Sequence, residues 1–265
     1  MFRETAPYFR SPEDAPPKYL AMFRAYIDES GHETKNWVIV GGFFGHELEW
    51  ERFVPLWKAA LGPQRKTLHM SSLRWKKDST RRLLAKLGPI PAECGPRRCL
   101  GGVNVEHYED LIVGTLAEKI MKGYQAALTP MVIRVVLAVP SNERIEFVFE
   151  EQHEYEEAVN NTMRLAVAAA SSGADMRTDD GLPKIAKWGF VPKGTTMMTD
   201  PADYLAYAAR EFEIDIGSKR SQWCYPILIA GGNETYGHIL TRDEIRRSIQ
   251  DAFNAVADAS WRNAL

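Results

Sequence analysis

The chain has 265 residues, of which 45% are hydrophobic and 26% are charged, a composition typical of a globular protein with a full hydrophobic core. Its formal net charge of -2 excludes a strongly basic protein that binds nucleic acid through its overall charge, so any polyanion site has to be a local patch. Three widely spaced cysteines, Cys94, Cys99 and Cys224, suggest neither a disulfide framework nor a zinc ligand set, and they favour a cytoplasmic location.

The first ordered element is expected at about Leu20. Residues 1–19 combine charged side chains with four prolines and have no apolar core segment, so we interpret them as an irregular arm rather than a secretory signal. No apolar run approaches the roughly 18–20 residues that span a bilayer, because the longest candidate, residues 131–139, is interrupted by Arg134. We therefore expect no membrane partner.

Two strands are predicted at the start of the ordered chain. Residues 21–27 and 37–44 are rich in aromatic and β-branched side chains, and the turn-forming residues between them indicate a hairpin. The apolar side chains of residues 47–61 recur at helical spacing, with Pro55 bending or dividing the helix. Residues 67–73 predict a short extended segment that holds His69.

Strands and helices alternate over the rest of the chain. A long helix is expected over 109–128, and residues 131–139 either continue it or fold back. The other predicted elements are strands over 99–105, 145–150 and 184–191 and helices over 79–87, 156–171, 200–214 and from a capping box at Thr241. This alternation is typical of an α/β layered sheet. We predict one α/β domain over residues 20–265, in which the region of about 47–97 is a helical, basic insertion.

Asp28 lies where the first predicted strand leaves the sheet, in the segment Tyr26-Ile27-Asp28-Glu29-Ser30-Gly31. Side chains alternate between the faces of a strand, so Asp28 shares a face with Tyr26, whereas Glu29 points away or lies in the turn. Ligands commonly bind at the carboxyl ends of strands in α/β sheets. In the alternative interpretation, Asp28 only caps the following turn through a side-chain hydrogen bond.

Glu150 and Asp203 are the other two candidate acids. Glu150 ends the apolar strand 145–149 and is followed by Glu151; alternatively, both are solvated charges near the start of the next helix. In Asp200-Pro201-Ala202-Asp203, we place Asp200 at the N-cap and Asp203 at N3. Capping accounts for Asp200. Asp203 lies opposite a small-residue face that lets the helix pack closely on a sheet, formed by Ala202, Ala206 and Ala209.

Together, the three acids predict a metal site. Hard divalent cations bind several oxygen ligands that converge from separate elements, and carboxylates supply them. Two such ions about 4 Å apart can activate water and stabilise the leaving oxygen of a phosphodiester. The sequence therefore predicts a site for Mg²⁺ or Mn²⁺ at Asp28, Glu150 and Asp203.

Three sequence blocks carry a resemblance to a known family. The blocks are Tyr26-Ile27-Asp28-Glu29-Ser30-Gly31, the strand end Phe147-Val148-Phe149-Glu150-Glu151, and Ala202-Asp203-Tyr204-Leu205-Ala206-Tyr207. Their order resembles the signature of a bacterial and phage family of uncharacterised proteins, number 3800 among the domains of unknown function. The resemblance implies an RNase H-like mixed sheet flanked by helices, as in RNase H and retroviral integrases, and a nuclease fold.

The resemblance also implies roles for individual residues. Asp28, Glu150 and Asp203 would be the metal-binding acids, with Glu151 as a substitute ligand. His69 falls where many members have a histidine or an acid, and it would act as a base or in product release; the alternative is a hydrogen-bonded structural histidine. The middle acid is usually an aspartate, and glutamate is one methylene longer.

The predicted insertion concentrates positive charge. Its basic residues surround a tryptophan, a combination that suits phosphate contacts and base stacking, although a solvated helix face is the alternative. The candidate nucleic-acid residues are Arg74, Trp75, Lys76, Lys77, Arg81 and Arg82.

Two functional hypotheses follow. The first is a metal-dependent nuclease that hydrolyses DNA or RNA with metal-activated water. The second is a non-catalytic nucleic-acid-binding or protein-binding member of the same fold, in a phage-defence or mobile-element setting. A hydrolase with a Ser or Cys nucleophile has little support, because the chain has no Gly-x-Ser-x-Gly motif. The C-terminal helix, with Trp261, would allow a homodimer.

Overall fold

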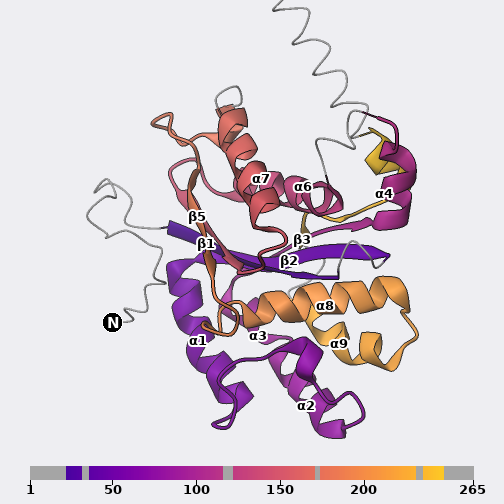
Figure 1. Cartoon of the computed structure of the whole chain (residues 1–265). Coiled ribbons are helices and arrows are strands. Elements are labelled where there is room, and N and C mark those ends of the chain that lie inside the picture. Colours follow the sequence, from indigo (N-terminus) through magenta and orange to yellow (C-terminus); the bar gives the residue numbers. More distant parts are fainter. Residues whose placement is uncertain (1–21, 32–35, 116–121, 171–173, 231–234, 248–265) are drawn as a thin grey trace, which may run out of the picture.

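The computed structural model describes residues 22–31, 36–115, 122–170, 174–230 and 235–247. Within them, seven strands form one mixed sheet in the order β5-β4-β1-β2-β3-β6, and β7 also pairs with β3. Helices cover both faces of this sheet (Figure 1). The prediction of an α/β protein with a mixed sheet flanked by helices is therefore confirmed. The predicted N-terminal arm lies outside the described residues.

The first three strands form an antiparallel meander. β1 (Met22–Ser30) pairs with β2 (Trp37–His46), which pairs with β3 (Arg97–Asn104), so the predicted hairpin is confirmed. β1 runs three residues beyond its predicted end at 27. Asp28 and Glu29 consequently lie within the strand, where Asp28 is opposite Gly41.

Two parallel strands extend the sheet on the other side of β1. β4 (Arg144–Glu150) pairs with β1, and β5 (Ile185–Val191) pairs with β4. Parallel neighbours need long crossover connections, and α7 (Glu156–Ala169) lies in the connection between β4 and β5. β6 (Thr235–Tyr236) and β7 (Ile239–Leu240) run parallel to β3 at the opposite edge. The carboxyl ends of β1 and β4 therefore lie side by side.

The alternation of side chains along each strand builds a hydrophobic core on either face of the sheet. Ala25, Ile27 and Phe147 belong to the core that also contains α6 (Gly123–Ala138) and α7. Tyr26 and Val148 belong to the core on the opposite face. Asp28 and Glu150 continue the period of Tyr26 and Val148, so both acids point to the second face.

The second face is covered by α8 (Asp200–Ile214), with further helices packed around it (Figure 1). These are α1 (Glu47–Leu61), α2 (Asp78–Leu87), α3 (Ile90–Cys94) and α9 (Lys219–Ile229). Trp50, Phe53 and Trp57 of α1 are buried in the same core as Tyr204 of α8. The region predicted as an insertion is therefore an integral part of this core.

None of the helices in the described ranges combines the length and apolarity that crossing a membrane requires.

One predicted helix is wrong. Residues 109–128 do not form a single helix: α4 (Val105–Ile112) ends early, and α6 begins at Gly123. Gly114 has a φ of 76°, a left-handed conformation that ends helices. α6 then continues through Pro130 to Ala138, which confirms the alternative in which residues 131–139 extend a helix.

The capping box at Thr241 is present, with 2.9 Å between the Thr241 nitrogen and Glu244 Oε2. Trp261 lies outside the described residues.

Small residues let α8 approach the centre of the sheet, as the sequence predicted. Ala202, Ala206 and Ala209 are all buried. A Cβ atom at Gly41 would lie 3.1 Å from the backbone nitrogen of Ala206, which leaves no room for a larger side chain without a shift. Because Gly41 is opposite Asp28 in the sheet, this contact fixes α8 directly beside the candidate acid.

A glycine on the other face gives a test of the packing. A Cβ atom at Gly101 of β3 would overlap the carbonyl oxygen of Ala127 in α6, whereas a Cβ atom at Gly123 would meet its nearest neighbours at 3.9 Å. We expect Gly101→Ala to lower the free energy of unfolding by about 2–3 kcal/mol. Gly123→Ala, the matched control, should leave it unchanged or raise it by up to about 1 kcal/mol. Urea unfolding measures both, and equal stabilities would contradict this packing.

Candidate functional site

Three sequence-predicted acids gather at the edge of the sheet where β1 and β4 end. Ile27 is paired with Phe149, so the following residues, Asp28 and Glu150, emerge at the same edge and on the same face. The first turn of α8, which contains Asp203, packs beneath this face. The charges of Asp203 and Glu150 both raise the pKa of Asp28, so the three carboxyl groups are within electrostatic range of one another.

Asp28 is buried, with 1% of its surface exposed. Its Oδ1 accepts a hydrogen bond of 2.8 Å from the backbone N–H of Glu29, and its Oδ2 has no hydrogen-bond partner within the described structure. No bond to Ser30 or Gly31 is found among the described contacts, so the turn-capping interpretation is not supported. A buried carboxylate oxygen that is left without a partner is costly, and such a group is a candidate for function.

Glu150 is not a solvated charge at a helix entry, because only 7% of its surface is exposed. Its Oε2 lies 3.0 Å from the Nζ atom of Lys193, in the loop after β5. Its Oε1 accepts a bond of 3.3 Å from the backbone N–H of Gly194 and lies 3.5 Å from the Thr199 hydroxyl. The loop between β5 and α8 thus encloses this carboxylate.

Asp203 is bonded to the segment that precedes α2. Its Oδ2 accepts a hydrogen bond of 2.8 Å from the backbone N–H of Met70 and lies 3.1 Å from Nδ1 of His69. Nε2 of His69 is 2.9 Å from the Ser71 hydroxyl. The hydrogen bond to Asp203 raises the pKa of His69, which favours the protonated, proton-donating form of the ring over a general base.

The predicted position of Asp200 is wrong, although its role is structural. Thr199 is the N-cap, so Asp200 occupies N1 and Asp203 occupies N4. Asp200 Oδ2 accepts hydrogen bonds of 2.9 Å from Trp57 Nε1 and of 2.8 Å from the backbone N–H of Leu68. It therefore ties α1 and the following segment to the start of α8 instead of capping its own helix.

The electrostatics of the site centre on Asp28. Burial raises the pKa of the Asp28 carboxyl well above its ordinary value, and the neighbouring negative charges raise it further. In order of decreasing effect, these neighbours are Glu29, Asp203 and Glu150. Groups of like charge held together in this way are typical of sites that bind a cation or transfer protons.

Glu29 also belongs to the cluster of acids, although strand alternation predicted that it would point away from them. Burial raises the pKa of Glu29 to about 8, and Glu150 and Asp203 also raise it, against the opposing charge of Lys193. Its Oε1 is buried without a hydrogen-bond partner among the described residues. Strand alternation does turn Glu29 to the face opposite Asp28, but at the end of the strand its charge still acts on the other acids.

Lys193 is the second residue that the sequence analysis missed. Burial acts to lower the pKa of its ammonium group, but the hydrogen bond and charge of Glu150 raise it on balance, together with the charge of Asp28. Lys193 thus supplies a positive charge to a group of four acids. It belongs to no recognisable motif, and only its position after β5 could have suggested it.

The remaining predicted ligand, Glu151, is not joined to the cluster. Its backbone N–H donates to the carbonyl of Val191, and no described contact brings its carboxylate to Asp28 or Asp203. Within the described ranges, no group of three or more His, Cys, Asp or Glu side chains is arranged so that it could hold a metal ion as it stands. Lys193 contacts an oxygen of Glu150, and His69 contacts an oxygen of Asp203. A metal ion would need both of these oxygens as ligands.

The predicted nucleic-acid residues divide into three groups. Arg74 and Lys77 line a cavity in front of α2. The guanidinium groups of Arg81 and Arg82 lie 3.5 and 3.9 Å from the carboxylate of Asp78, and Lys76 is exposed. The ring of Trp75 is stacked on Tyr207 with centroids 5.3 Å apart, so a structural role accounts for this ring.

All three cysteines are buried as free thiols. Burial raises the pKa of the thiols of Cys94, Cys99 and Cys224, which keeps them protonated and poorly nucleophilic. They do not form a nucleophilic site.

Comparisons with known proteins found no relative of this chain. No protein-family model matches the chain, and no curated protein and no solved structure matches it either. The candidate site therefore stands on its own geometry.

The burial of Asp200 leads to a testable dependence of stability on pH. The pKa of Asp200 is raised to about 8, mainly by burial, from an unfolded value of about 4. Because the folded state resists ionisation, the wild-type protein loses stability as the pH rises between these values, and Asp200→Asn does not titrate there. We expect the Asn variant to gain about 1–3 kcal/mol on the wild type between pH 4.5 and pH 8.5.

Chemical denaturation at the two pH values measures this gain. Asp200→Ala is the control, because it leaves Trp57 Nε1 and the Leu68 N–H without an acceptor and should be less stable at both pH values, by about 1–3 kcal/mol. A difference between wild type and Asn variant that stays constant with pH would show that Asp200 is not held in this environment.

Proposed function

We propose that this protein is a divalent-metal-dependent nuclease, with Asp28, Glu150 and Asp203 as its metal-binding acids. The observation that carries the proposal is Asp28: a fully buried carboxylate at a strand end, with an unpartnered oxygen and with three other acids as its electrostatic neighbours. A protein retains such an arrangement at a cost in stability, and a bound cation is the simplest means of offsetting that cost.

We further propose that the fold is RNase H-like. The support is the sheet: an antiparallel meander, β3-β2-β1, is extended by the parallel strands β4 and β5 next to β1. In this order Asp28 lies at the end of β1 and Glu150 at the end of its parallel neighbour β4. Fold alone does not fix activity, so the activity rests on the site.

Carboxylate oxygens are the ligand type that a hard cation such as Mg²⁺ or Mn²⁺ prefers, and the acids described here have to rearrange to hold one together. The oxygen ligands come from three separate elements, β1, β4 and α8, and Glu29 adds a fourth acid at the edge of the cluster. When bound, a divalent cation would supply charge for activating the attacking water and for stabilising the leaving oxygen. Because Lys193 lies on Glu150, its ammonium group has to move for that oxygen to become a ligand.

The chain's own residues supply the remaining chemistry. His69 is held between Asp203 and Ser71, its side chain is 40% exposed, and its raised pKa suits the donation of a proton to a leaving oxygen. Lys193, once it leaves Glu150, carries a positive charge at the rim of the site, where it suits a phosphate group. The basic residues that precede α2, Arg74 and Lys77, would bind the strand.

The test is metal-dependent cleavage. We expect wild-type protein to cleave at least one of single-stranded DNA, double-stranded DNA, single-stranded RNA and double-stranded RNA in Mg²⁺ or Mn²⁺, and not in EDTA. Asp28→Asn and Asp203→Asn should each reduce the rate at least about 100-fold, because each removes a charged ligand. Gel analysis of labelled substrates measures these rates.

Glu146→Gln is the matched control, because Glu146 is a buried carboxylate of β4, the strand that ends at Glu150, and it pairs with Arg24 and Lys187 away from the cluster. Its activity should stay within a few-fold of wild type once folding is verified. Asp28→Asn should be at least as stable as wild type in EDTA, since it removes a repelled charge. Absence of cleavage in every metal and substrate, with nucleic-acid binding intact, would refute the nuclease and leave a non-catalytic binding protein.

The position of Lys193 gives an independent prediction about the metal. Because its ammonium group competes with a cation for Glu150, Lys193→Gln should bind Mn²⁺ about 3–10-fold more tightly than wild type, as measured by calorimetry or by the metal-induced rise in melting temperature. Lys187→Gln removes a lysine from Glu146, outside the cluster, and should leave Mn²⁺ affinity unchanged. If both variants bind Mn²⁺ equally, Lys193 does not occupy the cation position.

A further inference from the structure

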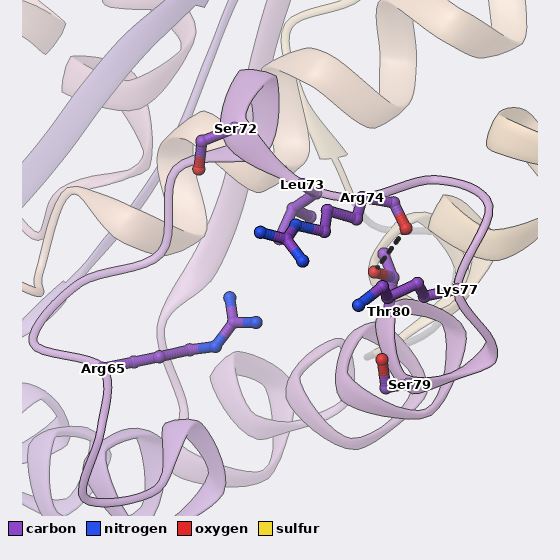
Figure 2. Close-up of a pocket in the computed structure, with 7 residues that line it drawn as sticks. All are labelled: Arg65, Ser72, Leu73, Arg74, Lys77, Ser79 and Thr80. Atoms are coloured by element: carbon purple, nitrogen blue, oxygen red, sulfur yellow. Dashed lines mark hydrogen bonds between the residues drawn. The ribbon is translucent and has the colours of Figure 1, made fainter.

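A cavity of about 300 Å³ opens in front of α2, beside the candidate site. Such a volume corresponds to roughly ten water molecules, which is room for a phosphate group and part of an attached sugar. Figure 2 shows the side chains of Arg65 and Arg74 pointing into the same space, with Lys77 and Ser79 on its other side. The full lining is Arg65, Ser72, Leu73, Arg74, Lys77, Ser79 and Thr80.

The three cations of this cavity are not neutralised. Within the described parts of the chain, neither Arg65, Arg74 nor Lys77 forms an ion pair with an acidic side chain. The acid closest in sequence, Asp78, instead pairs with Arg81 and Arg82 on the helix surface. The cavity therefore carries an excess of about three positive charges in a chain whose net charge is negative.

Hydrogen-bond donors complete the cavity. Ser79 presents a hydroxyl group, whereas the Ser72 hydroxyl donates to the His69 carbonyl at 2.8 Å, and α2 begins at Asp78 with no side-chain cap on Lys77. The first backbone N–H groups of a helix have no intrahelical acceptor, and the helix dipole favours an anion there. The hydroxyl of Thr80 donates to the Arg74 carbonyl at 2.9 Å, which holds the two ends of this loop together (Figure 2).

The same short segment connects the cavity to the carboxylates. Leu68, His69 and Met70 are bonded to the aspartates of α8, and Ser72, two residues later, lines the cavity. The cavity thus lies at a position that the proposed active site fixes. A nucleic-acid strand that follows this segment would contact both the acids and the arginines.

We infer that this cavity is a phosphate-binding pocket that anchors the substrate strand next to the acids, with Arg65 and Arg74 as its principal ligands. The identity of the anchored molecule as a nucleic-acid substrate rests on the proposed function; the binding of phosphate does not. Arginine suits this role because its planar guanidinium binds phosphate oxygens in pairs.

The pocket is tested by binding in EDTA, without catalysis. The probe is a fluorescein-labelled single-stranded 12-nucleotide DNA with a free 5′-hydroxyl, measured by anisotropy over a range of salt concentrations. Relative to wild type, the double variant Arg65→Gln/Arg74→Gln should bind at least about 10-fold more weakly, with a salt dependence reduced by about one in log-log slope. The control Arg81→Gln/Arg82→Gln removes the same charge from the same region outside the cavity and should change affinity less than about 3-fold.

Inorganic phosphate provides a second arm. It should displace the probe from wild type more effectively than potassium chloride of equal ionic strength, and this excess should be absent in the Arg65/Arg74 variant. A 5′-phosphorylated copy of the probe distinguishes the source of the phosphate: tighter binding that depends on the two arginines indicates a terminal phosphate, and equal binding indicates an internal phosphodiester. Thermal unfolding verifies that the variants fold. If the double variant does not fold, Lys77→Gln replaces it, with an expected loss of probe affinity of about 3-fold or more.

Equal losses in the pocket variant and in the control would refute the pocket and leave only general charge attraction. The result is separable from the nuclease test, because binding is measured without metal and can be repeated in the Asp28→Asn background. Cleavage by wild type with no binding defect in the pocket variant rejects the pocket alone, and a binding defect without cleavage rejects the nuclease alone.

Discussion

Asp28 sets the constraint on which the rest of the structure depends. Its carboxylate is buried at the end of the central strand β1, within the field of three other acids, where ionisation is strongly opposed. The fold moderates this repulsion with one lysine and with backbone N–H groups from flanking segments. A core built for stability alone would place an apolar residue there, so the retention of acids points to a use for the charge.

The surrounding elements hold these charges in place by contacts between distant parts of the chain. The indole of Trp57, on α1, donates to Asp200 at the start of α8, and the segment after α1 donates to Asp200 and Asp203 in turn. As a result, the helices on the second face act as the wall of the site as well as its hydrophobic support. The same segment places the arginine-lined cavity at a fixed position relative to the acids.

Much of this arrangement could be predicted from sequence because it follows from local periodicity. The alternation in β1 and β4 assigns Asp28 and Glu150 to one face, and the alanine face of α8 predicts its close approach to the sheet. Glu29 could not be assigned in this way, because alternation gives the direction of a side chain but not the reach of its charge at a strand end. Lys193 lies in a loop without a pattern, and the bond from Trp57 to Asp200 joins residues 143 positions apart. The basic cavity shows the same limit: Arg74 and Lys77 belong to a visible cluster, whereas Arg65 joins it only through the course of the chain.

The contact between Gly41 and Ala206 has a consequence for motion in the site. A Cβ atom at Gly41 would crowd the backbone of Ala206, so α8 packs directly on β2 at this point, and close packing opposes a shift of the helix toward the sheet. Lys193, by contrast, extends from a loop, and His69 from a short connecting segment. A rearrangement that admits a ligand would therefore involve these two connecting segments, which would move relative to the acids on β1, β4 and α8.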